Sequence, residues 1–254
     1  MARLDHARLP RHIALILDGN GRWATTRRLP RVFGHYEGAK SVREIVILAR
    51  EVGVSVLSLY AFSNENWARP KSEIHALMTL LKTYLARETD TMLKNGVRFH
   101  AMGQISRLPV AVVRLIREVE SRTAGQNEMT LVLALSYGGR AEIVDAAKRL
   151  AQDVQENKIL AADIDEARFA RYLYMPDLPD PDLLIRTSGE TRLSNFLLWQ
   201  MAYTEFYFTE TLWPNFTRCN FLEALLDYQS RERRFGGVLE AAPSDLPVAA
   251  QRSQ

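Results

Sequence analysis

One short segment, Asp18 to Trp23, places a carboxylate, two glycines and an arginine directly after an apolar run. Gly19 and Gly21 let the backbone approach a ligand closely and adopt positive φ. A helix starting near this point would direct free N–H groups at an anion, and Arg22 would add a fork for phosphate oxygens. A carboxylate beside an anion site is explained by a cation between them, and Mg²⁺ suits Asp18 because it takes one or two carboxylates plus substrate phosphates. The segment therefore predicts a magnesium-assisted phosphate site.

A second interpretation of this segment stays open. Asp18 could be the N-cap of a following helix, with the glycines serving only a strand-to-helix turn. The standard phosphate loops, G-x-x-x-x-G-K-[ST] and G-x-G-x-x-G, are both missing from the sequence, and Asn20 stands where D-x-D phosphatases carry a second aspartate. Zinc is disfavoured because the sequence has neither H-E-x-x-H nor paired Cys/His spacing.

Two more polar clusters follow apolar runs further along the chain. The first can hydrogen-bond an anion and adds an aromatic wall; it contains Ser63, Asn66, Trp67 and Arg69. The second offers two guanidinium groups and a hydroxyl for another anion; it contains Arg186, Arg192 and Ser194. A helix cap before Pro70 would explain a serine or an asparagine in the first cluster but not the cluster as a whole. Taken alone, the second is also explained by a solvated loop with surface arginines.

The elements that must position these clusters follow from the hydrophobic pattern. Strand-length apolar runs, several of them apolar throughout as in strands buried on both faces, span Ile13–Leu17, Val54–Phe62, Val97–Met102, Met129–Leu135 and Leu183–Ile185. Helical spacing alternates with them over Gly38–Val52, Pro70–Gly96, Val110–Arg122 and Ala141–Val154. This order predicts an α/β fold with a mostly parallel sheet and helices on both sides. Because the polar clusters follow three strands of one sheet, they are expected to converge at its carboxyl edge, where Arg31 and His35 extend the cationic group.

Composition limits the classes of protein to consider. The 254 residues, 47% apolar and 25% charged, suit one globular domain over residues 1–239, with 240–254 expected as a disordered tail. A net charge of +3 does not argue for a nucleic-acid partner. With the single cysteine Cys219, no apolar leader between Met1 and His12 and no run near the ~20 apolar residues of a membrane span, we expect a cytoplasmic protein. Peripheral contact with a membrane surface stays open.

At this point the sequence resembles the cis-prenyltransferases, and within them the bacterial undecaprenyl diphosphate synthase branch. The resemblance extends over about residues 10–237 and rests on the segments HIALILDGNGRW, RVFGHYEGAKSV, LYAFSNENWARP, LSYGGRAEIV, LLIRTSGETRLSNFLLWQMAYTEFYF, LWPNF and RERRFGG. It implies a single domain with a six-stranded, mostly parallel sheet and an apolar product tunnel. It also implies a homodimer whose C-terminal arm, from Arg231 to Gly237, reaches the partner's site.

The resemblance further implies roles for individual residues. Asp18 and Asn66 would be catalytic, with Asp18 and Glu205 as ligands of Mg²⁺. Allylic diphosphate binding would fall to Gly19, Asn20, Gly21, Arg22, Trp23, Arg31 and His35, with a further substrate-contacting group at Ser63, Asn64, Glu65, Trp67 and Arg69. Isopentenyl diphosphate would be held by Arg186, Arg192, Leu193 and Ser194. Thr191 departs from the pattern, because some relatives carry a histidine there near the metal.

The implied reaction is cis-prenyl chain elongation. Isopentenyl diphosphate units would be added to an allylic primer such as farnesyl diphosphate, giving a long polyprenyl diphosphate such as undecaprenyl diphosphate, a lipid carrier precursor for cell-wall glycan synthesis. Two alternatives compete: a magnesium-dependent phosphohydrolase using Asp18, and a regulatory subunit of a prenyltransferase complex. The second should lack part of the catalytic set, whereas this chain keeps Asp18, Asn66, Arg186 and Arg192.

Overall fold

Six strands form one parallel sheet, in the order β3-β4-β2-β1-β5-β6. The computed structural model describes residues 4–231. The strands are β1 His12–Ile16, β2 Val56–Ser63, β3 Val97–Met102, β4 Met129–Tyr137, β5 Leu183–Arg186 and β6 Glu205–Phe208. The predicted fold class is confirmed, and the chain forms a single domain. The expected tail at 240–254 lies outside the described residues.

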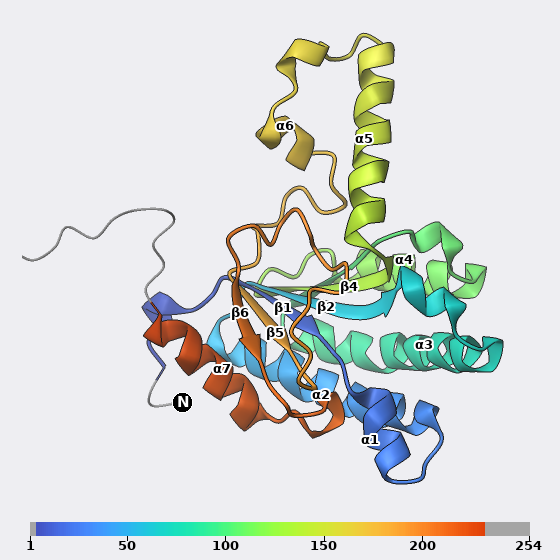
Figure 1. Ribbon diagram of the computed structural model, residues 1–254, viewed down its shortest axis with the longest axis vertical. Coiled ribbons are helices and arrows are strands. Elements are labelled where there is room, and N and C mark those ends of the chain that lie inside the picture. The colour runs from blue at the N-terminus through green and yellow to red at the C-terminus, as the bar shows by residue number, and fades with distance from the viewer. Residues whose placement is uncertain (1–3, 232–254) are drawn as a thin grey trace, which may run out of the picture.

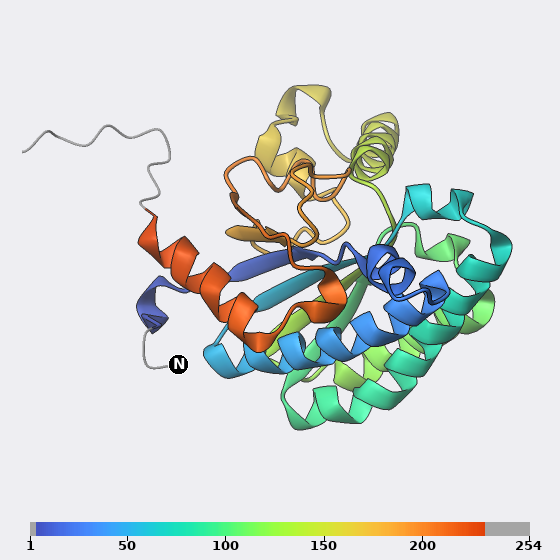
Figure 2. The same cartoon turned by 60° about the horizontal axis from the view of Figure 1, so that its bottom comes forward.

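The α-helices lie on both sides of this sheet, but the second face is covered largely by residues outside the helices. The helices are α1 Asn20–Thr26, α2 Arg31–Val52, α3 Lys71–Lys94, α4 Val110–Thr123, α5 Gly139–Gln155, α6 Glu166–Ala170 and α7 Arg218–Ser230. Short 3-10 turns span His6–Arg8 (η1), Asn64–Ala68 (η2), Ile105–Arg107 (η3), Ala161–Asp163 (η4) and Trp213–Asn215 (η5). In Figures 1 and 2, α2, α3 and α7 pack beneath the sheet, whereas α5 and α6 project away from its other face.

Both faces of the central strands are buried, which explains their nearly continuous apolar runs. In β1, Ile13 and Leu15 belong to the larger apolar core on the side of α2, α3 and α7. The alternate residues, Ala14 and Ile16, belong to a smaller core on the opposite face, closed by Phe196 and its neighbours. The same alternation continues through the adjacent strands. No helix within residues 4–231 has the length and apolarity of a membrane span.

Helix α2 begins at Arg31, seven residues before the predicted start at Gly38. The prediction missed its first turns because two glycines, Gly34 and Gly38, interrupt the apolar pattern there. A Cβ at Gly34 would lie 1.9 Å from the Asn20 carbonyl oxygen, and one at Gly38 would lie 2.2 Å from Asn20 Oδ1. The helix therefore crosses the first loop at contact distance. This early start matters for the site, since it places Arg31 and His35 four residues apart on the first turns of α2.

Candidate functional site

The three polar clusters converge at the carboxyl edge of the sheet. Asp18 follows β1 by two residues, Ser63 is the last residue of β2, and Arg186 is the last residue of β5. Ile16 is in register with both Tyr60 and Arg186, so the ends of these strands lie side by side. The expected convergence is therefore present in the structure.

An ion pair between Asp18 and Arg186 lies at the centre of this edge. Arg186 Nη2 donates to Asp18 Oδ2 at 2.9 Å, and the Arg186 side chain is only 2% exposed whereas that of Asp18 is 35% exposed. Arg186 Nη1 donates to Ser194 Oγ at 2.6 Å and to the Arg192 carbonyl. The N-cap of α1 is Gly19 rather than Asp18, so the alternative in which Asp18 only caps a helix is wrong.

The two glycines of the first loop serve different purposes. Gly19 has φ +103°, a conformation that favours glycine, and its backbone N–H donates to Asp18 Oδ1 at 2.7 Å. Gly21 lies inside α1 without positive φ, contrary to the sequence prediction. It leaves room for a side chain: a Cβ there would lie 2.7 Å from the Arg31 guanidinium carbon, so a larger residue would displace Arg31 from its place against the backbone.

Two acidic residues that the sequence analysis missed neutralise the arginines of the site. Glu190 pairs with Arg22 at 2.7 Å and with Arg192. Glu73, on the first turn of α3, lies 3.0 Å from Arg69, 3.6 Å from Arg31 and 3.8 Å from the ring of His35. An anionic ligand would therefore meet cations that are already held in place by internal carboxylates. Sequence patterns offered no reason to select these two carboxylates, because acidic residues do not suggest an anion-binding site.

His35 is neutral at physiological pH. Burial, reinforced by the positive charge of Arg69, lowers its pKa to about 4, although Glu73 opposes this shift. Its Nε2 is buried without a hydrogen-bond partner among the described residues, and so is Asn20 Oδ1 nearby. Unpartnered buried polar atoms are costly in a folded protein, so their presence here favours a polar ligand that satisfies them.

The segment after β2 forms η2 and holds Asn66 at the edge of the site. Asn66 Oδ1 accepts from the Ser63 backbone N–H at 3.2 Å in a capping box. Its remaining polar group is the amide NH₂, which can only donate. Trp67 is fixed from the other side, because its Nε1 donates to Ser136 Oγ at 2.9 Å and its ring packs edge-on against Phe62. This geometry suits Asn66 for orienting a ligand and not for accepting a proton.

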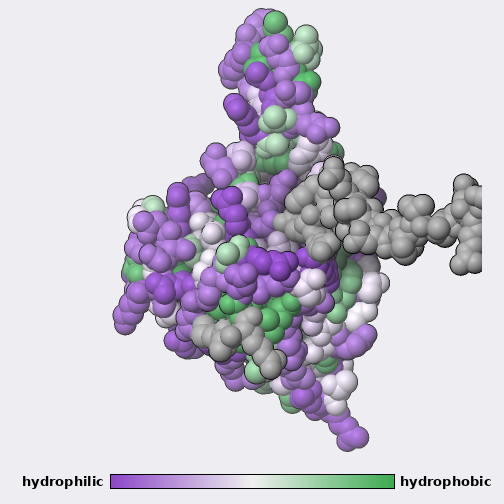
Figure 3. All heavy atoms as spheres, turned by 90° about the vertical axis from the view of Figure 1, so that its left-hand side faces the viewer, coloured by the Kyte–Doolittle hydropathy of each residue, from purple (hydrophilic) through white to green (hydrophobic). Residues whose placement is uncertain are grey.

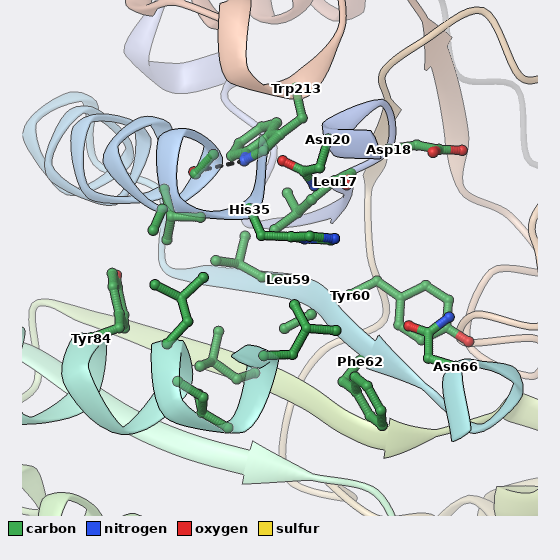
Figure 4. Close-up of a pocket in the computed structure, with 18 of the residues that line it drawn as sticks. Leu17, Asp18, Asn20, His35, Leu59, Tyr60, Phe62, Asn66, Tyr84 and Trp213 are labelled. Carbon is green, nitrogen blue, oxygen red and sulfur yellow. Dashed lines mark hydrogen bonds between the residues drawn. The ribbon is translucent and has the colours of Figure 1, made fainter. Parts of the chain in front are cut away.

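A cavity of about 210 Å³ opens from these groups into the protein (Figure 4). Its polar end contains Asp18, Gly19, Asn20, Gly21, Arg31, His35, Asn66 and Arg69. Its apolar end lies between β2 and the helices α2 and α3, and contains Val42, Leu59, Leu77, Leu80, Leu81, Tyr84, Leu133 and Leu135. Ala61 lines the cavity, whereas Met129 is buried in the core at the start of β4. The product tunnel itself stays a prediction.

Not every predicted residue gathers at this cavity. Trp23 Nε1 donates to Asn215, with Arg27 over its ring, and Asn64 Oδ1 accepts from Ser136 and Arg107. Leu193 packs against the smaller core. These contacts support the loops around the site.

Glu205 lies far from Asp18 within one chain. It begins β6 and is in register with Leu183, the first residue of β5, about 10 Å along the strand from Arg186. Its carboxylate accepts from Arg231 at 2.8 Å. Within residues 4–231 no three His, Cys, Asp or Glu side chains gather as a metal site. A metal held by Asp18 would therefore need phosphate oxygens from the substrate, and its sharing with Glu205 stays a prediction.

Comparisons with known proteins agree on one family. The family described as "Putative undecaprenyl diphosphate synthase" matches residues 16–236. The isoprenyl transferase of Geobacter sulfurreducens is 53% identical over 90% of this chain and 93% of its own, and that of Bacillus subtilis is 51% identical over 91% and 88%.

Solved structures give the same picture. Lavandulyl diphosphate synthase from Lavandula x intermedia, in complex with dimethylallyl diphosphate, has a TM-score of 0.88 and 37% identity, covering 91% of this chain and 99% of that one. A "probable undecaprenyl diphosphate synthase" from Campylobacter jejuni has a TM-score of 0.74 and 38% identity, covering 89% and 98%. The chain belongs to the cis-prenyltransferase family and is an isoprenyl transferase.

Proposed function

We propose that this isoprenyl transferase adds isopentenyl diphosphate units to an allylic primer, farnesyl diphosphate, with Mg²⁺, and makes a long polyprenyl diphosphate such as undecaprenyl diphosphate. In a bacterial cell this product would serve as the lipid carrier precursor for cell-wall glycan synthesis. One observation supports this proposal above others. Asp18 lies between two groups of arginines. Arg186, which pairs with Asp18, belongs to one of them, and Arg31 and Arg69 of the other lie at the mouth of an apolar cavity. Such a site suits two diphosphates and one growing hydrocarbon chain.

The allylic diphosphate would lie at the polar end of the cavity. The backbone N–H groups of Asn20 and Gly21, with Arg31 and the unpartnered Nε2 of neutral His35, would donate to its oxygens. Its hydrocarbon would extend between α2 and α3. Isopentenyl diphosphate would lie on the other side of Asp18, against Arg186, Arg192 and Ser194.

Bond formation requires the primer's carbon–oxygen bond to break while the terminal alkene carbon of isopentenyl diphosphate bonds to the allylic carbon. Charge grows on the leaving diphosphate, where preorganised donors lower the barrier. Magnesium bound to Asp18 and to phosphate oxygens would supply further charge neutralisation there. Asp18 suits this role, since its carboxylate is one-third exposed at the edge of the cavity.

A proton must then leave the new chain. The Asn66 amide oxygen is committed to the Ser63 N–H, so its NH₂ would orient a diphosphate oxygen that accepts the proton. The departing diphosphate is the base that fits this arrangement. Trp67, held by Ser136, would shield the allylic carbon from water.

Assembly and location form part of the same proposal: a cytoplasmic homodimer with peripheral membrane contact during product release. The projection formed by α5, α6 and their connection exposes the apolar residues Val144, Leu160 and Ile164. The rest of this projection is largely hydrophilic on the side shown in Figure 3. Exposed apolar residues on an element outside the main body suit a protein interface. The C-terminal arm expected to reach the partner's site begins at Arg231 and otherwise lies outside the described residues.

The decisive experiment incubates the purified chain with farnesyl diphosphate, labelled isopentenyl diphosphate, Mg²⁺ and a nonionic detergent, and separates the products by chromatography. A polyprenyl ladder ending in a long species is expected. Phosphate release without isopentenyl diphosphate would instead identify a phosphohydrolase. Activity that requires a second, different subunit would identify a regulatory component.

A further inference from the structure

The loop that carries Arg192 and Ser194 has an unusual backbone. Ser194, Asn195 and Leu197 all have positive φ, at +49°, +65° and +43°. Asparagine adopts this conformation readily, but serine and leucine do so rarely. Residues in such conformations persist only where the surrounding contacts determine them. The contacts that hold this loop therefore decide where the Ser194 hydroxyl lies, and with it the Arg186 guanidinium.

Asn195 makes hydrogen bonds through its backbone carbonyl and through both polar atoms of its side chain. Its backbone carbonyl accepts from the Gly139 N–H at 2.6 Å, and its Oδ1 accepts from the Arg140 N–H at 2.9 Å, both on the first turn of α5. Its Nδ2 donates to Glu65 Oε1 at 2.9 Å. The amide orientation is set by chemistry, because the oxygen faces a donor and the nitrogen faces a carboxylate.

Further contacts hold Ser194 and Leu197, on either side of Asn195. The Tyr60 hydroxyl donates to the Ser194 carbonyl at 3.3 Å. The Leu197 N–H donates to the Tyr137 hydroxyl at 3.2 Å, and that hydroxyl donates to the fully buried carboxylate of Glu142. On either side of Asn195 the loop is thus tied to β2, β4 and α5, and Asn195 links it to η2.

Glu65 is the residue directly before Asn66, so this link joins two parts of the site that are 130 residues apart in the chain. Partial burial alone would raise the pKa of Glu65, but hydrogen bonds from Asn195 and Ser63 hold it below its usual value. Glu65 therefore stays a carboxylate and a strong acceptor for the amide.

We propose that Asn195 is a positioning residue that couples the loop of Arg192 and Ser194 to the segment of Asn66, and so sets the distance between the two diphosphate sites. This inference rests on the two-diphosphate function proposed above. Each site keeps its own cationic ligands without the link, so binding of one substrate alone does not depend on it. Turnover does depend on it, because a misplacement of about 1 Å can lower a rate by about 10²-fold.

The test compares Asn195→Asp, Glu65→Gln and the double variant in the full-length protein. Asn195→Asp keeps the acceptor for the Arg140 N–H but places a carboxylate against Glu65. The expected result is a kcat about 10- to 100-fold below wild type, with the Kd for farnesyl diphosphate alone within about twofold. In the double variant the new amide of residue 65 can donate to the new carboxylate of residue 195, so kcat should recover at least several-fold from the Asn195→Asp value.

Asn157→Asp is the matched control, since Asn157 also has positive φ, at +55°, in an exposed turn after α5. It should keep wild-type kinetics. The proposal is overturned if Asn195→Asp retains wild-type kcat, if the double variant is no faster than Asn195→Asp, or if farnesyl diphosphate binding weakens in step with kcat. Failure of the wild-type chain to elongate farnesyl diphosphate would refute the proposed function instead.

Discussion

Replacing Asp18 with asparagine separates the charge of this residue from its shape. The carboxylate accepts from the Gly19 N–H through Oδ1 and from Arg186 through Oδ2. An amide has one oxygen, so Asp18→Asn can satisfy one of these donors but not both. Arg186 then stays in a nearly fully buried position without its only carboxylate partner among residues 4–231.

The stability cost follows from this geometry. A hydrogen bond to a charged group contributes about 1.5–3 kcal/mol. Asp18 is 35% exposed, so water partly replaces it, and a cost reduced from this range to about 1–2 kcal/mol is expected. For a domain of this size that corresponds to a fall in Tm of about 2–8 °C. The fold should survive, as judged by an unchanged circular dichroism spectrum.

The cost in activity should be far larger. Loss of one group that stabilises developing charge lowers kcat by about 10²–10³, measured as incorporation of labelled isopentenyl diphosphate. Asp182→Asn is the matched control, because Asp182 Oδ2 accepts from the backbone N–H groups of Arg11 and His12 at the opposite edge of the sheet. It should lower Tm and leave kcat near wild type. A kcat for Asp18→Asn within threefold of wild type, or equal to that of the control, would refute the role of Asp18 in the reaction.

Three more predictions follow from the site and the core. Ala61 lines the cavity, so Ala61→Phe should shorten the longest product seen by chromatography; an unchanged product length would contradict a cavity that holds the chain. Burial lowers the pKa values of both His12 and His35 to about 4 from 6.5. At a pH between these two values the unfolded chain binds more protons than the folded one, so stability falls as pH falls. The free energy of unfolding, measured in urea, should therefore decrease by about 2 kcal/mol per histidine from pH 7 to pH 5. A His12→Gln variant with an undiminished pH dependence would argue against this origin. Excess EDTA should abolish elongation and added Mg²⁺ should restore it without changing Tm, because residues 4–231 offer no cluster of ligands on their own; full activity in EDTA would remove the metal from the mechanism.

The sequence predicted the buried parts of the fold and missed the half-buried ones. Five apolar runs correspond to β1 through β5; β1, β4 and β5 are buried on both faces and apolar nearly throughout, whereas the edge strand β3 is only partly buried. The sixth strand was predicted only by the family resemblance and not by the apolar pattern. Its four residues are all partly exposed, and Glu205 heads a short run of aromatic residues that does not alternate. Helix α7 has a weakly segregated apolar face, and it too gave no clear signal.

For the site, residue types were predictable but pairings were not. Asp18 and Arg186 were both candidates, yet 168 residues separate the two members of the pair. Local patterns carry no information about such partners, because the sheet register decides them. Asn195 shows the same limit: its importance comes from three contacts to distant segments, and its type alone suggests only a turn.

The cavity combines polar and cationic groups at its mouth with aliphatic walls behind them. This shape admits any slender amphiphile with an anionic head, whatever its chemistry, since apolar walls select for width and length more than for identity. Fatty acids and anionic surfactants share this outline, so they should compete with the primer and make poor additives in preparations of the enzyme. The same asymmetry is a starting point for inhibitor design: an unbranched tail that fills the space between α2 and α3 can carry a single acidic group in place of a diphosphate.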